Sequence, residues 1–242
     1  MKSRVRNKAR KLVDWLGGVD PLILLVLLVL VGASWAFFEI ADEPTGGRIP
    51  SMDERILLAL RHPENVADPI GPLWFEEAVR DITSLGSVAV LGLVTLAVLG
   101  FLSLRRKSQA IGLVLGATLG GQLLSSLLKH WIDRPRPEVV TPLMHASTAS
   151  FPSGHAMLSA VVYLTLGALL ARFLQSRELR LYVLFVSILL TLLVGLSRIY
   201  LGVHYPSDVL AGWSIGLAWT LFCWEVARFL QVRGLVEPSI KP

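Results

Sequence analysis

The sequence has 242 residues, of which 53% are hydrophobic and only 17% charged, and its mean hydropathy is +0.61. About a quarter of the residues in ordinary soluble domains are charged, so this composition excludes most soluble domains, and it equally excludes a disordered chain. Cys223 is the single cysteine, which excludes a disulfide framework and a cysteine-based zinc site. We therefore expect one integral membrane domain over residues 1–242, whose chemistry depends on other side chains.

Six uncharged apolar runs divide the chain, and each is close to the roughly 17–25 residues that cross a hydrocarbon core as a helix. We predict an all-α fold, a bundle of six transmembrane helices. The runs are Pro21–Phe38, Ile82–Leu104, Ser108–Leu128, Gly154–Ala171, Leu181–Ser197 and Val209–Trp224. The last two are short enough to be buried helices of a soluble protein. The first could imitate a signal peptide, although it exceeds the usual core of about 7–15 residues.

The basic residues predict how the bundle is oriented. An even number of spans puts both ends of the chain on one side, and that side would hold most of the 23 Lys and Arg residues. These include the basic segment 1–20 and the tail 231–242. Segment 39–81, which follows the first span, instead has ten acidic residues against four basic ones. Since basic residues are retained in the cytoplasm, the termini should be cytoplasmic and segment 39–81 should lie outside.

The outer segment 39–81 is long enough to have structure of its own. Ser51 and Glu54 are spaced as a capping box at the start of a helix over Met52–Arg61. A second short helix, Leu73–Arg80, contains a tryptophan and a phenylalanine, which favour the headgroup level of a membrane. We predict two interfacial helices here. A loop that merely joins two spans is the alternative.

Polar side chains gather where the last four predicted spans meet the outside. Charged groups held at membrane depth are functional candidates by default. Taken singly, each basic residue could instead be an interfacial side chain with its stem in lipid and its head in water. The residues concerned are Lys129, Arg134, Arg136, Ser153, His155, Arg198, His204 and Asp208. Because their loops share one face of the membrane, we expect them to form one site.

Several of these residues suit the binding of a phosphate. Ser153 and Gly154 stand where a helix should begin, so a serine cap, a small residue and free backbone amides would face an anion. Lys129, Arg136 and Arg198 can together offset the charge of a phosphate dianion. The sequence has no carboxylate cluster for magnesium at this place, so we expect these cations to take its role and no metal or other cofactor to be needed.

His204, Asp208 and His155 supply the reactive groups. A neutral imidazole can attack phosphorus, and a carboxylate bonded to its other nitrogen fixes the tautomer and stabilises the resulting cation. A spacing of four residues lets Asp208 meet His204 across one helical turn or a tight loop. His155 can then protonate the leaving oxygen. The pair His204 and Asp208 alone would be read as a structural hydrogen bond at a helix start.

The order and spacing of these residues resemble the three-part signature of the type 2 phosphatidic acid phosphatase superfamily. The matching residues, over 129–208, are Lys129 with Arg136-Pro137, then Pro152-Ser153-Gly154-His155, then Ser197-Arg198 with His204 and Asp208. The resemblance implies a six-helix membrane fold and hydrolysis through a phosphohistidine without a metal. It implies His204 as nucleophile, Asp208 as its orienting group and His155 as acid. It implies that phosphate is bound by Lys129, Arg136, Ser153, Gly154 and Arg198. Arg134 lies inside the first spacer, and a role carries over to it only weakly.

We therefore predict an integral membrane phosphatase of the bacterial cytoplasmic membrane that cleaves a lipid headgroup phosphate or diphosphate at the outer face. Phosphatidic acid, phosphatidylglycerophosphate, undecaprenyl diphosphate and lipid A phosphate all fit, because the motifs bind phosphate and not the lipid. A lipid phosphotransferase with the same phosphohistidine is one alternative. A lipid-binding or lipid-translocating protein without catalysis is another. Membrane and lipid phosphate are the expected partners, nucleic acid is not, and the oligomeric state is open.

Overall fold

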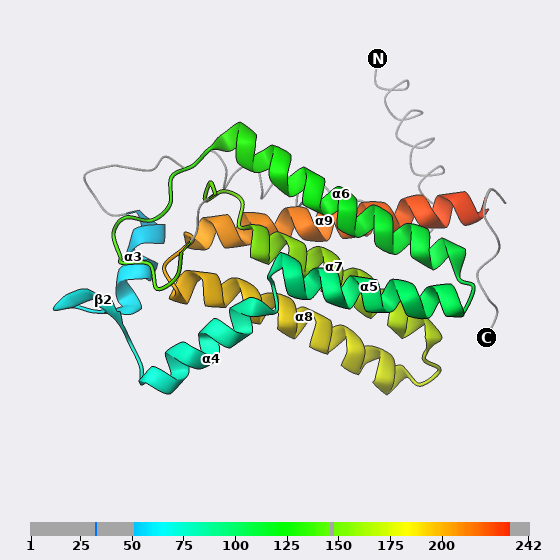
Figure 1. Ribbon diagram of the computed structural model, residues 1–242, viewed down its shortest axis with the longest axis horizontal. Helices are drawn as coiled ribbons and strands as arrows, with labels where there is room; N and C mark the ends of the chain where they lie inside the picture. The colour runs from blue at the N-terminus through cyan, green and yellow to red at the C-terminus, as the bar shows by residue number, and fades with distance from the viewer. Residues whose placement is uncertain (1–31, 33–50, 146–147, 233–242) are drawn as a thin grey trace, which may run out of the picture.

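A computed structural model of the chain describes residue 32 and residues 51–145 and 148–232, which are mostly helical (Figure 1). The described elements are α3 (Met52–Ala59), β1 (Arg61–His62), β2 (Asn65–Pro69), α4 (Leu73–Ser84), α5 (Val88–Leu104), α6 (Ser108–Ile132), α7 (Gly154–Phe173), α8 (Arg177–Tyr200) and α9 (Pro206–Val232). The long helices run side by side along the molecule, and α3 with the strands lies at one end of them.

Helix α7 is the centre of the bundle, because it packs against α5, α6, α8 and α9. In its most apolar stretch of 18 residues, 56% of the residues are buried, against 22% in α6 and in α8. Many large apolar side chains of α6 and α8 are exposed on the outside of the bundle. In the described part of the chain, four helices, α6 to α9, are each long enough and apolar enough to cross a membrane. The predicted first span, Pro21–Phe38, lies outside the described residues apart from Gly32, so the six-span count stays a prediction.

The predicted span Ile82–Leu104 is divided between two helices. Helix α4 ends at Ser84, α5 begins at Val88, and the two are bent by 48°, so the pair would be a fifth span if it crosses as one unit. Ser87 has extended backbone, and its side chain accepts a bond from the Val90 N–H (3.2 Å), which starts a new helix. The predicted interfacial helix Leu73–Arg80 is the first part of α4, which packs against α8.

Close packing also fixes the corner between α4 and α5. A Cβ placed on Gly86 would lie 2.3 Å from Val194 Cγ1 and 3.3 Å from His155 Cβ. Only a residue without a side chain fits at that separation. The corner between α4 and α5 therefore lies directly against α8 and the start of α7.

The other spans are longer than the apolar runs that predicted them. Helix α6 continues to Ile132, α8 covers Arg177–Tyr200, and α9 covers Pro206–Val232. Uncharged runs stop at the first charged side chain, whereas a helix continues through Lys or Arg without penalty. Helix α6 is terminated by the next residue, Asp133, whose backbone is left-handed at φ 42°, a conformation that stops further helical bonding.

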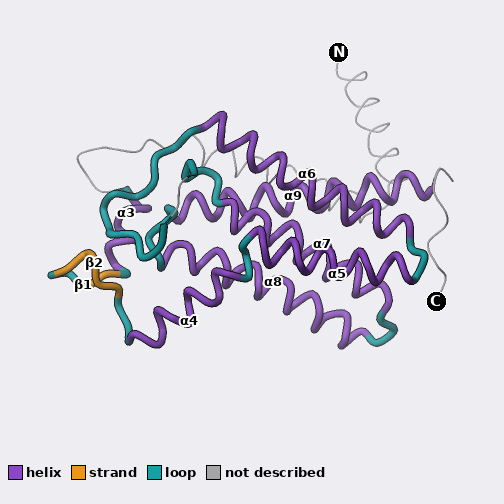
Figure 2. Tube along the Cα trace, viewed as in Figure 1, coloured by secondary structure: helices purple, strands orange, loops and turns teal. Residues whose placement is uncertain are grey.

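A two-stranded antiparallel hairpin of β1 and β2, which the sequence did not predict, is added to the mostly helical fold (Figure 2). The capping box of Ser51 and Glu54 is present, but α3 ends at Ala59 instead of Arg61. Arg61 and His62 form β1 instead, and Pro63 keeps His62 out of a helix, since proline disfavours helical backbone at the preceding residue. His62 is accordingly in a strand and pairs with Asn65.

Helices α8 and α9 approach closely at Gly195, where an added Cβ would lie 2.3 Å from Trp213 Cζ2. The Trp213 indole N–H donates to the Thr191 carbonyl (3.1 Å), which holds the ring in place. We expect Gly195→Ala to lower the midpoint of thermal unfolding in detergent. Overpacking costs about 1–3 kcal/mol, which outweighs the helix preference of alanine over glycine, about 1 kcal/mol.

Gly116→Ala is the matched control, because a Cβ there meets nothing within 4 Å. This variant should unfold at the wild-type temperature or above it. A Gly195→Ala protein as stable as Gly116→Ala would contradict the described packing of α8 on α9.

Candidate active site

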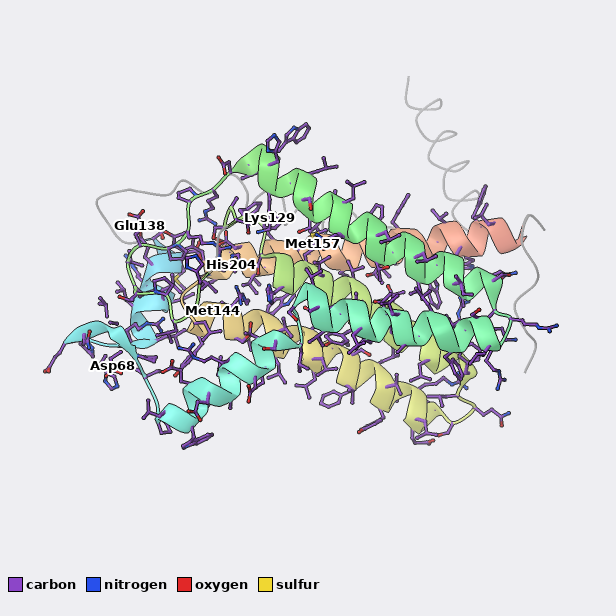
Figure 3. The ribbon with its side chains drawn as sticks, in the orientation of Figure 1. Asp68, Lys129, Glu138, Met144, Met157 and His204 are labelled. Carbon is purple, nitrogen blue, oxygen red and sulfur yellow. The ribbon has the colours of Figure 1, made fainter. Side chains whose placement is uncertain are left out.

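The loop after α6, the start of α7 and the loop between α8 and α9 meet at one end of the bundle. Figure 3 shows Lys129, Met144 and His204 gathered there, toward the end that holds α3. His155, in the first turn of α7, has Arg198, His204, Lys129 and Arg136 as electrostatic neighbours. All of the predicted site residues therefore lie in one cluster, although they come from four separate parts of the sequence.

His204 is enclosed in the protein, with 2% of its surface exposed. Its Nδ1 lies 3.6 Å from Asp208 Oδ2, and its Nε2 lies 3.4 Å from Arg136 Nη1. Burial lowers the pKa of His204 to about 4, and the neighbouring Asp208 carboxylate opposes this shift. The imidazole is consequently neutral near pH 7, as a nucleophile must be. The separation of 3.6 Å is longer than a hydrogen bond, and catalytic bonds of this kind often tighten only around substrate.

The carboxylate of Asp208 is fully buried and is bonded on both oxygens. Oδ2 accepts from the Ser150 hydroxyl (2.5 Å) and from the Tyr205 N–H (2.8 Å). Oδ1 accepts from Arg134 Nη1 (2.7 Å). Ser150 Oγ is also 3.4 Å from His204 Nδ1, so this serine lies between the imidazole and the carboxylate. These partners balance the charge of Asp208 and fix its orientation.

The loop residues Thr148 and Ala149 hold the heads of two cations. Lys129 Nζ donates to the Ala149 carbonyl (2.7 Å) and to Thr148 Oγ1 (3.3 Å). Arg136 donates from Nε to the Thr148 carbonyl (2.9 Å) and from Nη1 to the Val203 carbonyl (2.5 Å). Burial lowers the pKa of Arg136 from its ordinary value. Two positive groups are thus fixed beside His204 by neutral partners.

Ser153 and Arg198 have buried polar atoms without a partner in the described structure. Ser153 Oγ and Arg198 Nε make no hydrogen bond, although both residues are at least 97% buried. Arg198 Nη1 is held by Thr83 Oγ1 (3.1 Å) and Met144 Sδ (3.0 Å). Leaving a buried donor unsatisfied costs about 1–3 kcal/mol. Donors of this kind inside a group of cations are what a bound oxyanion would satisfy.

The start of α7 differs in one detail from the prediction. Ser153 occupies the cap position before Gly154, but its side chain makes no capping bond. The backbone N–H of Ser153 donates to the Asp208 carbonyl (3.0 Å), and this bond joins the start of α7 to α9. Gly154 lies against Lys129, since an added Cβ would be 3.4 Å from Lys129 Cε.

Three further residues contribute to the cluster beyond the set that the motifs singled out. Arg134, to which the resemblance gave only a weak role, binds the orienting carboxylate directly. Ser150 bonds the same carboxylate, and its nearness to the Pro-Ser-Gly-His motif is the signal that could have pointed to it. Asp53 contacts Arg134 from α3, and no local pattern indicates a contact between residues so distant in sequence.

The acidic and histidine residues do not gather as metal ligands do. Among the residues that the structure describes, no three His, Cys, Asp or Glu side chains are grouped so that they could hold a metal ion. The side chains beside His204 that can donate hydrogen bonds are cationic, as in Arg136, or neutral, as in Ser150.

Comparison with known proteins gives consistent matches. The family model described as PAP2 superfamily matches residues 110–231. Phosphatidylglycerophosphatase B of Bacillus subtilis (strain 168) is 38% identical over 149 residues, which are 60% of this chain and 71% of that protein. Lipid A 1-phosphatase of Rhizobium etli is 39% identical over 39% of this chain and 40% of its own length.

A solved structure matches most of the chain. The crystal structure of a transmembrane PAP2 type phosphatidylglycerolphosphate phosphatase from Bacillus subtilis superposes with a TM-score of 0.75 at 31% identity. The match covers 83% of this chain and 96% of that one.

The apolar helices and the cationic site define an integral membrane protein that handles phosphate groups. With the matches above, this protein is a lipid phosphatase, a hydrolase. The chain belongs to the PAP2 superfamily.

Ser150→Ala tests the hydroxyl bridge between Asp208 and His204. We expect kcat for phosphate release from a lipid phosphate to fall about tenfold, because Asp208 loses one donor that fixes its orientation. KM should stay within about threefold, since Ser150 contacts the orienting carboxylate and not a predicted phosphate ligand. Steady-state kinetics of the purified protein in detergent measure both constants.

Ser159→Ala is the control, because Ser159 is equally buried and, among the described residues, its hydroxyl bonds only the Ala156 carbonyl (3.0 Å) within α7. Its kcat should match that of the wild type. An unchanged kcat in Ser150→Ala would show that the bridge does not contribute to turnover.

Proposed function

We propose that this enzyme hydrolyses the phosphate of a lipid headgroup through a phosphohistidine on His204, without a metal ion. The unpartnered buried Ser153 Oγ and Arg198 Nε, beside Lys129 and Arg136, are the observation that carries the proposal. A phosphate bound among them would give these two atoms the hydrogen-bond partners that they lack, and it would offset the repulsion between the cations.

The first step transfers the phosphoryl group to His204. Nε2 attacks phosphorus while the bond from phosphorus to the lipid oxygen breaks. His155, protonated beside the negatively charged phosphate, donates its proton to that oxygen and becomes neutral. The orienting carboxylate of Asp208 stabilises the charged phosphohistidine. In the second step a water molecule gives a proton back to His155 and attacks phosphorus, so that inorganic phosphate leaves and His204 returns to its neutral form.

The cations act on the transition state. Charge develops on the phosphoryl oxygens as the old bond breaks, and fixed donors aimed at those oxygens lower the barrier more than any other single effect. Lys129, Arg136 and Arg198 supply the positive charge. Ser153 and the backbone amides at Gly154 supply further donors at the start of α7, where the helix dipole favours an anion.

The names of the relatives suggest which lipids to test first. Phosphatidylglycerophosphate follows from the Bacillus subtilis protein and lipid A phosphate from the Rhizobium etli protein. Within this proposal the enzyme lies in a bacterial cytoplasmic membrane with its termini in the cytoplasm, and the site receives lipids from the outer leaflet.

His204→Ala tests the mechanism. We expect turnover to fall about 10⁴-fold or more for every lipid phosphate that the wild type hydrolyses, because the covalent nucleophile is lost. The assay uses the purified protein in detergent with phosphatidylglycerophosphate, phosphatidic acid, undecaprenyl diphosphate and lipid A, each with and without a chelator. Wild-type activity should not respond to the chelator.

His62→Ala is the control histidine, since it lies on the exposed hairpin beside Asp68 (4.0 Å). It should keep wild-type turnover. Substantial activity in His204→Ala would contradict the phosphohistidine, and inactivation of the wild type by the chelator would contradict metal independence.

Cysteine labelling tests the orientation. In a Cys223→Ser background, a cysteine at Asp68, on the hairpin, should react with an impermeant maleimide added outside intact cells. A cysteine at Arg105, which follows the far end of α5, should react only after the membrane is opened, because the hydrocarbon core separates the two ends of that helix. The reverse pattern would overturn the proposed orientation.

A further inference from the structure

Asp53, in the first turn of α3, is a buried carboxylate that the proposed reaction does not use. It is 4% exposed and comes from the outer segment, far in sequence from the motifs. Its Oδ1 accepts from the Ser207 N–H (2.9 Å), and its Oδ2 accepts from the Ser207 hydroxyl and from Arg134 Nη2 (3.2 Å). Buried carboxylates are strongly unfavourable unless they are paired and bonded, so these contacts determine where Asp53 lies.

One of these contacts caps the helix that carries Asp208. Ser207 is in the first turn of α9, where backbone N–H groups have no acceptor within the helix. Asp53 supplies that acceptor and places a negative charge at the positive end of the helix dipole. Since Asp208 is the next residue, the cap fixes the turn from which the orienting carboxylate extends.

The second contact reaches the same carboxylate through a guanidinium group. Arg134 donates from Nη1 to Asp208 Oδ1 (2.7 Å) and from Nη2 to Asp53 Oδ2 (3.2 Å). Its guanidinium carbon also lies 4.6 Å from the centre of the Tyr205 ring. A planar fork held by two carboxylates and a ring is restrained on more sides than a fork bonded to Asp208 alone.

We propose that Asp53 is a positioning residue for the lipid phosphatase reaction. It holds the start of α9 and the fork of Arg134, and through them it sets the direction in which Asp208 faces His204. This inference rests on the proposed phosphohistidine mechanism. Because Asp53 acts on the orientation of the nucleophile, its loss should slow phosphoryl transfer while phosphate binding is preserved.

Asp53→Asn tests the inference in the full-length protein in detergent. Asparagine keeps the size of the side chain and an acceptor for Ser207, but it has no charge for Arg134. We expect kcat to fall about 10-fold to 100-fold, the range for partners that orient an active-site group. KM and the inhibition constant for inorganic phosphate should stay within about threefold of wild type, because the phosphate ligands are untouched. Asp53→Glu, which restores the charge, should recover part of kcat.

Glu54→Gln is the matched control, one residue further along α3. Glu54 accepts from the Ser51 N–H (2.8 Å) in the capping box, and glutamine can accept the same bond. Its kcat should stay within about twofold of wild type. An unchanged kcat in Asp53→Asn would overturn the inference. So would a loss of kcat with equally weakened phosphate inhibition and no recovery in Asp53→Glu, because that pattern describes a general collapse of the fold.

His204→Ala, measured in the same assay, separates this inference from the function on which it rests. If His204→Ala is inactive and Asp53→Asn is normal, the positioning role alone is wrong. If His204→Ala turns over normally, the phosphohistidine mechanism is wrong, and the positioning role fails with it.

Discussion

The structure of the site depends on burying the carboxylate of Asp208. An isolated carboxylate at that depth would be prohibitively unfavourable, so it must be paired with a cation and hydrogen-bonded. Arg134 comes from the loop after α6, Ser150 from the loop before α7, and the Tyr205 N–H from the loop between α8 and α9. These three connections meet at one place, where together they compensate one buried charge. His204 is held against the same charge.

The cations present the opposite problem. Lys129, Arg136 and Arg198 lie close enough to influence one another, and like charges in a partly buried cluster repel. Carbonyl and hydroxyl groups from 148–149 hold two of them but do not neutralise them. The site therefore tolerates a concentrated positive charge and, at Ser153 Oγ and Arg198 Nε, two buried polar atoms that have no partner in the described structure. Both features are relieved together by an anion, which is why the geometry favours phosphate chemistry over a purely structural role.

Packing between α7 and α9 fixes the distance between the parts of the site. A Cβ on Gly212 would lie 2.8 Å from the Ser153 carbonyl, and one on Gly216 would lie 2.7 Å from the Met157 carbonyl. Glycines of this kind let two helix backbones approach closely, as is common between helices in membranes. Ser153, which precedes α7, and Asp208, in the first turn of α9, are thereby held one backbone hydrogen bond apart.

The sequence by itself determined the apolar helices, the motif residues and their gathering on one face, because hydropathy and spacing are local properties of the chain. It predicted the capping box at Ser51, but not the hairpin after it or the break before Val88, where single residues end a helix inside an otherwise continuous pattern. Only the tertiary structure decided that Arg134 and Ser150 bond Asp208 and that Asp53 bonds Arg134. Which side chains make these contacts depends on which of them reach the buried charge in three dimensions. Residues that are far apart in the sequence leave no periodic signal of such a contact.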